Sequence, residues 1–323
     1  MPRLAASLSV SLAASFALCL LAAPVTAETT LRVMSYNIWG GGGNEAKGID
    51  ETVAVLKAAN PDIVGIQETL LEGQTCTASD CAPEGTSVAR ALADAMGYYY
   101  YDQTGVNAAL WANAILSRYP IGAPTPNQLG VPIDVNGTEV WIFNIHHDDE
   151  PYQPYQLLGI EYGPAPYIKT EAEAVEFAKQ TRSGGMDLLE ADMMAAAGAA
   201  AVFVTGDFNE PSHLDWTDAA VAAGQHPIKV DWPTTKQLTE QGFVDTYRVV
   251  HPDPVAKPAY TWTPRYDEAA ADDHPDRIDF VFAKGATLKV GNAAIVGEDG
   301  PRTDLKVMPW PSDHRAVIAE VTF

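Results

Sequence analysis

Hydrophobic residues along this chain gather into short runs that end abruptly in polar residues. Residues 202–209 read VFVTGDFN, an apolar run that ends in Gly, Asp and Asn. Such a run predicts a strand that is buried along its length and delivers polar side chains at one rim of a sheet. Asp207 and Asn209 are two positions apart and would point to the same side of an extended chain.

The same pattern recurs four more times. Any one of these strand ends could be a capped turn, since Gly, Asp and Asn are ordinary turn residues. Five of them together predict that the polar residues meet at one rim. In chain order, the polar residues at the strand ends are Asn37, Glu68, Asn144 with His146, Asp207 with Asn209, and Asp313 with His314, the last pair just before a final strand at 316–323.

Apolar residues at helical spacing predict helices between these strands. One helix is expected over 49–59 and another over 87–96, where Gly97 ends it. The sequence GGGGN at 40–44 lies between a predicted strand and the first helix. It lacks the Lys-Ser/Thr ending of a phosphate-binding P-loop, so we interpret it as a flexible loop.

A longer helix is predicted over 170–200. Thr170 and Glu173 stand in the relation of a capping box at its start. Gly184 and Gly185 interrupt the helical pattern, and glycine weakens a helix interior. We therefore expect a kink or two separate helices there.

Tyrosines are concentrated in two places. Four in succession at 98–101 predict a strand with aromatic cross-strand packing rather than a pocket wall. The others lie in a Pro-rich connection, where they could stack on a substrate or simply hold a surface loop by aromatic packing. These residues are Tyr152, Tyr155, Tyr162 and Tyr167.

The first 27 residues have the pattern of an export signal. Arg3 is the lone early charge, an apolar stretch follows from Leu4, and Val25-Thr26-Ala27 resembles a small-residue cleavage site. This apolar stretch is too short and too early to favour a membrane span, and no later stretch is long enough for one. We expect a signal peptide at 1–27 and a secreted or periplasmic mature chain.

The remaining chain, 28–323, is interpreted as a single catalytic domain. No linker or repeat divides it, and the polar strand ends span almost its whole length. Export leaves two cysteines, Cys76 and Cys81, which in an oxidising compartment would close a small disulfide loop.

The chain is strongly acidic. Its formal net charge is −22, with only 20 lysines and arginines, and these are dispersed. A duplex DNA binder needs a basic patch or stripe to neutralise phosphates. Long-range attraction of a polyanion is therefore unfavourable, although a local basic groove stays open.

Two further groups of acidic residues stand out near the C-terminus. Asp272, Asp273 and His274 form a cluster that could bind a cation, but we favour a solvated loop. Asp279 faces opposite to its apolar neighbours in a predicted strand. A buried carboxylate needs a partner, and a catalytic histidine would supply one.

Six of these motifs, in this order, resemble the endonuclease/exonuclease/phosphatase superfamily. That superfamily includes pancreatic deoxyribonuclease, repair nucleases, neutral sphingomyelinases and inositol polyphosphate 5-phosphatases. The resemblance implies an α/β fold: a four-layered α/β sandwich with two packed mixed β-sheets flanked by helices. The motifs are SYNI at 35–38, QE at 67–68, NIH at 144–146, GDFN at 206–209, RID at 277–279 and SDH at 312–314.

The resemblance also implies metal-dependent hydrolysis of a phosphoester. Glu68 would bind Mg²⁺ or Mn²⁺, with Asn37 and Asp313 nearby, because oxygen ligands suit these ions. Asp207 would orient or deprotonate the attacking water. The remaining assignments are Asn209 on the developing charge, His314 on the phosphoryl group or in proton transfer, Asp279 holding His314, and His146 across the phosphate.

The assignment of His146 to the catalytic position has an alternative. His147 stands where many relatives have an apolar residue, so it competes with His146 for the catalytic position. Adjacent residues on a strand face opposite ways, so only one of the two should reach the site.

These observations predict an exported metal-dependent phosphoesterase. Its acidity favours a small-molecule or lipid-linked phosphoester over duplex DNA. A secreted nuclease and a sphingomyelinase-like enzyme are the alternatives, although no amphipathic hairpin for a membrane surface stands out. A catalytically silent binding module ranks lower, because Glu68, Asp207 and His314 are all present.

Overall fold

The computed structural model describes residue 1 and residues 28–71, 85–264, 267–268 and 270–323. Residues 2–27 of the predicted signal peptide lie outside the described residues, as do Cys76 and Cys81. Within the described part of the chain, no helix combines the length and the apolar character needed to cross a membrane.

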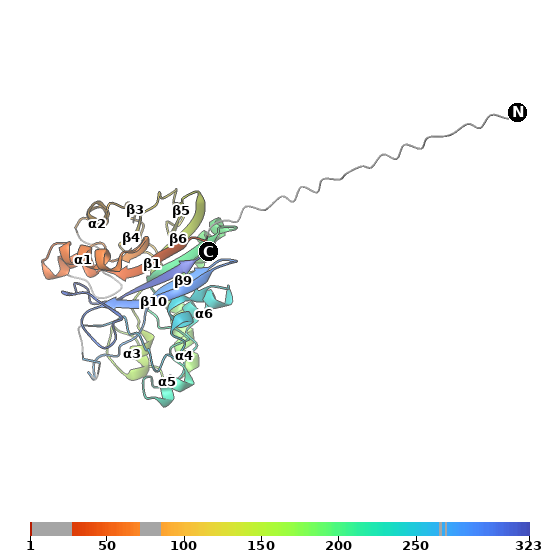
Figure 1. Cartoon of the computed structure of the whole chain (residues 1–323). Coiled ribbons are helices and arrows are strands. Elements are labelled where there is room, and N and C mark those ends of the chain that lie inside the picture. The colour runs from red at the N-terminus through yellow and green to blue at the C-terminus, as the bar shows by residue number, and fades with distance from the viewer. Residues whose placement is uncertain (2–27, 72–84, 265–266, 269) are drawn as a thin grey trace.

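Two mixed β-sheets form the centre of the molecule (Figure 1). The larger has seven strands in the order β11-β10-β12-β1-β2-β4-β3, and β1 runs parallel to β2 but antiparallel to β12. The predicted last strand is confirmed as β12. The bounds are β1 Thr30–Asn37, β2 Ile63–Gln67, β3 Tyr99–Gln103, β4 Asn113–Ser117, β10 Lys289–Gly297, β11 Leu305–Lys306 and β12 Ala316–Thr322.

The second sheet has five strands in the order β5-β6-β7-β9-β8. Here β6 and β7 are parallel, and the other neighbours are antiparallel. The bounds are β5 Gly130–Val135, β6 Thr138–His146, β7 Ala201–Asp207, β8 Val244–Asp245 and β9 Asp279–Lys284.

Helices cover the outer faces of both sheets. α1 and α2 pack on the seven-stranded sheet, and α4 and α6 pack on the five-stranded sheet (Figure 1). The helices predicted over 49–59 and 87–96 are confirmed. The bounds are α1 Asp50–Ala59, α2 Ala89–Met96, α3 Gln153–Leu158, α4 Glu171–Met193, α5 Asp218–Ala222, α6 Pro233–Glu240 and α7 Thr246–Val250.

Alternation of side chains along each strand builds the layers. In β1, Leu31 and Val33 enter the core between the two sheets, while Met34 and Tyr36 enter the core beneath α1 and α2. In β12, Val317 likewise faces the other sheet. Three apolar cores between four layers follow from this period of two, and the predicted four-layered sandwich is confirmed.

The two sheets approach each other closely near their polar rim. A Cβ atom on Gly65 would lie 2.1 Å from Thr205 Oγ1 and 2.4 Å from Asn144 Oδ1, so only glycine fits there. The Asn144 amide nitrogen donates to the Ile66 carbonyl at 2.8 Å, and its oxygen accepts from Gln67 Nε2 at 2.6 Å. Asn144 therefore ties the sheets together in the dry interior.

The long helix differs from its expected form. The capping box of Thr170 and Glu173 is present, but α4 runs unbroken through Gly184 and Gly185. The expected kink or break is wrong. A Cβ on Gly185 would lie 2.5 Å from both the Ala108 carbonyl oxygen and His147 Nδ1. The glycine is thus required by a tight packing contact and not by a bend.

Candidate metal and phosphoester site

The ends of β1, β2 and β7 bring three polar side chains together. Asn37 is the last residue of β1, Glu68 follows β2, and Asp207 ends β7. The Asn37 amide nitrogen donates to Glu68 Oε1 at 2.7 Å and to Asp207 Oδ2 at 3.0 Å. All three side chains are buried. One amide therefore holds two carboxylates from different sheets at the same point.

Glu68 is fixed by the glycine-rich segment. Residues Trp39–Glu45 form a short 3-10 segment, and Gly40 donates its backbone N–H to the Glu68 carbonyl oxygen at 2.9 Å. Gly40 has a φ of 72°, a conformation that glycine adopts without strain. Gly40, Gly41 and Gly42 are buried within this segment, and the expected flexibility of 40–44 stays a prediction.

Two histidines face Asp207. Its Oδ2 atom lies 3.6 Å from His314 Nε2 and 3.8 Å from His146 Nε2. Its other oxygen, Oδ1, accepts the backbone N–H of Asn209 at 2.9 Å. The carboxylate is thus oriented by the turn that follows β7 and presents Oδ2 to both imidazoles.

His314 is held from behind by Asp279. His314 Nδ1 lies 2.9 Å from Asp279 Oδ2, and both residues are buried. Burial alone would lower the pKa of His314, but the carboxylates of Asp279 and Asp207 outweigh it and raise that pKa well above its usual value. Burial raises the pKa of Asp279 to about 6 despite the attraction of His314. The close contact between Nδ1 and Oδ2 therefore favours the charged form of the imidazole.

His314 is also positioned by Ser312, in the segment that precedes β12. Ser312 Oγ accepts the His314 backbone N–H at 3.0 Å and donates to the Asn37 carbonyl oxygen at 2.7 Å. The hydrogen bond to Asn37 ties the segment before β12 to the end of β1. Ser312, which the sequence presented only as part of a motif, therefore sets the placement of His314.

His146 and His147 point in opposite directions. His146 turns to Asp207 and lies edge-on to Trp111, with ring centroids 6.0 Å apart. His147 packs on Phe208, and its Nδ1 lies 3.3 Å from the Ala108 carbonyl oxygen. Its burial lowers its pKa to about 3, so it is neutral at ordinary pH. Of the two, His146 reaches the rim.

The other two sequence candidates occupy the edge of this cluster. Asn209 has a φ of 47°, and its amide nitrogen donates to the His147 carbonyl oxygen at 2.8 Å. Its backbone conformation is one that non-glycine residues adopt infrequently, which is typical of functional sites. Asp313 is half-buried next to His314, and its charge contributes to the raised pKa of that histidine.

The donor set fits a hard divalent cation. One atom each from Glu68, Asp207 and His314 lies within 4.8 Å of the others, and all three residues are buried. Two carboxylates this close repel each other in a poorly solvated place, and a dication between them would offset that repulsion. Carboxylate oxygens are ligands that Mg²⁺ and Mn²⁺ prefer, and the Asn37 amide nitrogen orients both carboxylates by donating to them. The individual roles assigned from the sequence stay predictions.

Aromatic side chains form a wall beside His314. Trp262 lies 6.4 Å from the His314 ring, centroid to centroid, and packs against Tyr152 and Tyr155 at 5.5 and 5.7 Å. Tyr162 packs edge-on against Tyr155. The tyrosine-rich connection is therefore held by aromatic packing. Trp262 was not singled out as a site residue, and nothing in its sequence context marks it.

The acidic loop before β9 is largely buried. Tyr155 donates its hydroxyl to Asp273 Oδ1 at 2.6 Å, and Tyr152 donates to Asp276 Oδ2 at 2.8 Å. Asp273 and Asp276 are buried, whereas Asp272 is exposed. The interpretation of 272–274 as a solvated loop is wrong for Asp273, because this residue is buried and its Oδ1 accepts the Tyr155 hydroxyl.

Known proteins resemble this chain in sequence and in fold. The chain is 28% identical to an uncharacterized protein of Caenorhabditis elegans over 327 aligned residues, covering 91% of each chain. Among solved structures, an endonuclease/exonuclease/phosphatase family protein from Leptotrichia buccalis has a TM-score of 0.52 at 17% identity, covering 91% of this chain and 100% of the other.

Two further solved structures share the fold. The 3′ phosphatase NExo from Neisseria, bound to a product DNA hairpin, has a TM-score of 0.50 at 19% identity, covering 90% of this chain and 98% of the other. An AP endonuclease from Archaeoglobus fulgidus has a TM-score of 0.50 at 17% identity with the same coverage of each chain. The sequence profile of the endonuclease/exonuclease/phosphatase family matches residues 34–314, and the chain belongs to that family.

Proposed function

We propose that this protein is an exported, divalent-metal-dependent phosphoesterase that hydrolyses a small or lipid-linked phosphoester. The observation that carries the proposal is the convergence of Glu68, Asp207 and the His314–Asp279 pair at one rim. Export rests on the apolar N-terminal sequence and its small-residue cleavage pattern.

The proposal assigns a separate role in hydrolysis to each residue at the rim. Glu68 and Asn37, with Asp313 beside them, would hold Mg²⁺ or Mn²⁺, which when bound polarises a phosphoryl oxygen and stabilises the leaving oxygen. Asp207 Oδ2 orients the attacking water and accepts its proton. His314, kept cationic by Asp279, donates a hydrogen bond from Nε2 to a phosphoryl oxygen.

Two further side chains complete the arrangement. His146 Nε2 and His314 Nε2 lie 3.8 and 3.6 Å from Asp207 Oδ2, which supports a role for His146 on the phosphoryl group beside His314. Asn209 lies two residues beyond Asp207 and would meet the charge that develops on phosphorus. Developing negative charge is best stabilised by donors whose orientation is already fixed, and the Asn209 amide is fixed by its hydrogen bond to the His147 carbonyl oxygen.

Charge supports a small or lipid-linked ester. The net charge is −22, and two arginines close in sequence to site residues are paired with carboxylates. Arg277 pairs with Asp215 at 2.9 Å, and Arg315 pairs with Glu298 at 2.6 Å. Arginines held in this way do not offer the basic track that a DNA backbone needs.

A secreted nuclease is the second candidate. It is favoured by one observation: two of the structures that share the fold are a phosphatase bound to a DNA hairpin and an AP endonuclease. Both are under 20% identical to this chain, so the likeness concerns the fold. A sphingomyelinase-like enzyme is less favoured, because the exposed apolar side chains of the described residues, such as Tyr99, Leu158 and Met308, lie on separate elements.

The proposal is tested by measuring hydrolysis of a substrate panel with and without Mg²⁺ or Mn²⁺. The panel contains a phosphomonoester, a phosphodiester, sphingomyelin and plasmid DNA. Metal-dependent turnover of a small ester, with plasmid left intact, is the expected result, and turnover of sphingomyelin alone would favour the sphingomyelinase-like alternative. Faster cleavage of DNA at low salt would replace the proposed substrate with the nuclease alternative, and no turnover of any substrate would favour a binding module.

A further inference from the structure

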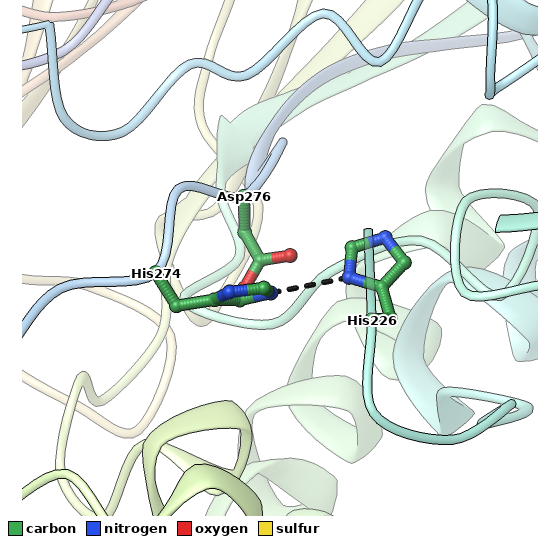
Figure 2. A group of neighbouring side chains, drawn as sticks. All are labelled: His226, His274 and Asp276. Atoms are coloured by element: carbon green, nitrogen blue, oxygen red, sulfur yellow. Dashed lines mark hydrogen bonds between the residues drawn. The ribbon is translucent and has the colours of Figure 1, made fainter. Parts of the chain in front are cut away.

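A second cluster of metal-ligating side chains lies outside the rim. His226 comes from the segment between α5 and α6, while His274 and Asp276 come from the segment before β9. One ligand atom from each lies within 4.8 Å of the others. Figure 2 shows the two imidazole rings and the carboxyl group facing one another. Forty-eight residues separate the two histidines, so tertiary folding alone brings them together.

The spacing of the imidazoles suits a shared ion. His226 Nδ1 lies 3.1 Å from His274 Nε2 (Figure 2). Two nitrogens bound tetrahedrally to one Zn²⁺ lie about 3.3 Å apart, given Zn–N bonds of about 2.05 Å. A neutral imidazole binds a metal through a ring nitrogen, and each of these two rings turns one nitrogen toward the other.

The surrounding side chains hold these ligands in place. Trp216 stacks on His226 with ring centroids 4.3 Å apart, and its Nε1 donates to Asp276 Oδ1 at 2.8 Å. Tyr152 donates to Asp276 Oδ2 at 2.8 Å. Outer partners that fix a histidine ring and a carboxylate are typical of metal sites. Asp276 and His226 are buried, and His274 is half-buried.

The cluster also has an access route. His226 and His274 line a surface hollow of about 410 Å³, together with Gly224, Tyr260 and Glu268. An ion can therefore enter from solvent, and the hollow leaves room for a water as a fourth ligand. Structural and catalytic zinc sites both use four ligands.

We propose that His226, His274 and Asp276 form a second metal site that binds a transition-metal dication such as Zn²⁺. Two imidazole nitrogens and one carboxylate favour a borderline ion of this kind over Mg²⁺, which prefers oxygen ligands. The rim group of Glu68, Asp207 and His314 has two carboxylates and one imidazole, so it is richer in the oxygen ligands that Mg²⁺ prefers.

The second site would stabilise the wall beside the rim. Asp276 and Trp262 pair through their backbones in both directions, at 3.1 and 3.0 Å, and Trp262 also bridges to His314. An ion on Asp276 would join the segment that carries His226 to the segment that supports Trp262. It acts on stability and on the placement of the wall, and it takes no part in the hydrolytic step.

The alternative is a hydrogen bond between two neutral imidazoles, which the same 3.1 Å distance permits. Measuring zinc binding to the purified protein distinguishes a metal site from this hydrogen bond. The protein is treated with chelator and titrated with Zn²⁺ in excess Mg²⁺, and bound zinc and thermal unfolding are measured. The variants are His274→Gln, His226→Gln, and His251→Gln as a control, since His251 bonds the Ala293 carbonyl at 2.9 Å elsewhere.

We expect the parent and His251→Gln each to bind one Zn²⁺ ion. His274→Gln should bind this ion about 100-fold more weakly or not at all. At a zinc concentration about 100 times the dissociation constant, Tm should rise by roughly 5 °C in the parent and not in His274→Gln. His274 is half-buried, so its variant should fold even if His226→Gln does not.

The variant Glu68→Gln distinguishes zinc bound at this second site from zinc bound at the rim. If zinc binding is lost in Glu68→Gln and kept in His274→Gln, the ion occupies the rim and the proposal is wrong. It is also wrong if the parent binds no zinc, or if an anomalous signal at the zinc edge in crystals is missing between His226 and His274. These readouts do not depend on turnover, so they are independent of the proposed function.

Discussion

The imidazole of His314 is held by the buried carboxylate of Asp279, with 2.9 Å between Nδ1 and Oδ2. This contact fixes the ring orientation and raises the pKa of His314, so that a donor at Nε2 faces Asp207. Asp279 lies behind His314 and acts through it. It is therefore a positioning residue in the proposed reaction.

Replacing Asp279 with Asn should reduce kcat by about 100- to 10,000-fold and change KM only a few-fold. The physical reason is that an amide permits the wrong histidine tautomer and no longer stabilises the imidazolium. Steady-state kinetics on the fastest substrate of the panel measure both constants. Asp304→Asn is the matched control, because Asp304 accepts from Lys257 at 2.8 Å near β11. Equal losses in the two variants would contradict the role of Asp279.

His146→Ala should lower kcat by about 100-fold or more, because a positioned imidazole contributes at least that much to phosphoryl chemistry. His147→Phe should keep kcat within about tenfold of the parent, since the His147 ring packs on Phe208 away from the rim. The two rates are compared at saturating metal. A larger loss of kcat in His147→Phe than in His146→Ala would assign the catalytic position to His147.

His147 should make folding stability sensitive to acid. Burial lowers its folded-state pKa to about 3, below the value of about 6.5 in an unfolded chain. The unfolded state therefore binds the extra proton, and the free energy of unfolding falls as pH drops from about 6.5 to about 3. One such group contributes a slope of up to about 1.4 kcal/mol per pH unit.

Urea denaturation of the parent and His147→Phe across pH 4–8 checks this contribution. The variant lacks the titrating group, so its stability should fall less steeply below pH 6.5 than that of the parent. Parallel curves for the two proteins would show that His147 is not a source of acid sensitivity.

Gly65→Ala should destabilise the protein by about 1–3 kcal/mol, because the added Cβ would overlap Thr205 Oγ1 and Asn144 Oδ1 where the sheets meet. Gly291→Ala is the matched control, because Gly291 also lies in a strand and its added Cβ would lie 3.8 Å from the Glu320 carbonyl oxygen, an ordinary contact distance. Denaturant midpoints give both values. A Gly65→Ala protein as stable as the Gly291→Ala protein would contradict the close approach.

Much of the rim could be predicted from sequence because strand ends are local signals. An apolar run that stops at Glu68 or Asp207 shows both a buried strand and its polar end. The ordered motifs then identified the family and the four-layered fold. Asn144 showed the limit of this reasoning: its place in a motif suggested chemistry, yet it joins the two sheets in their interior.

The remaining features depend on partners that are distant in sequence. Gly185 looked like a helix breaker because its packing against His147 is invisible in the local pattern. Asp273 looked solvated because its partner, Tyr155, lies 118 residues away. His226 carried no signal, since a lone histidine in a loop becomes a candidate ligand only when His274 lies beside it. Local periodicity cannot report such contacts.

Metal dependence of Glu68→Gln tests the central claim most directly. Hydrolysis of the fastest substrate is measured against Mg²⁺ or Mn²⁺ concentration for the parent, Glu68→Gln and Glu139→Gln, whose side chain only accepts from Trp141 near the start of β6. Saturable activation in the parent and in Glu139→Gln, with at least about 1,000-fold lower turnover in a folded Glu68→Gln protein, is the predicted result. Turnover that needs no metal, or that survives Glu68→Gln, would contradict a metal-dependent phosphoesterase site at this rim.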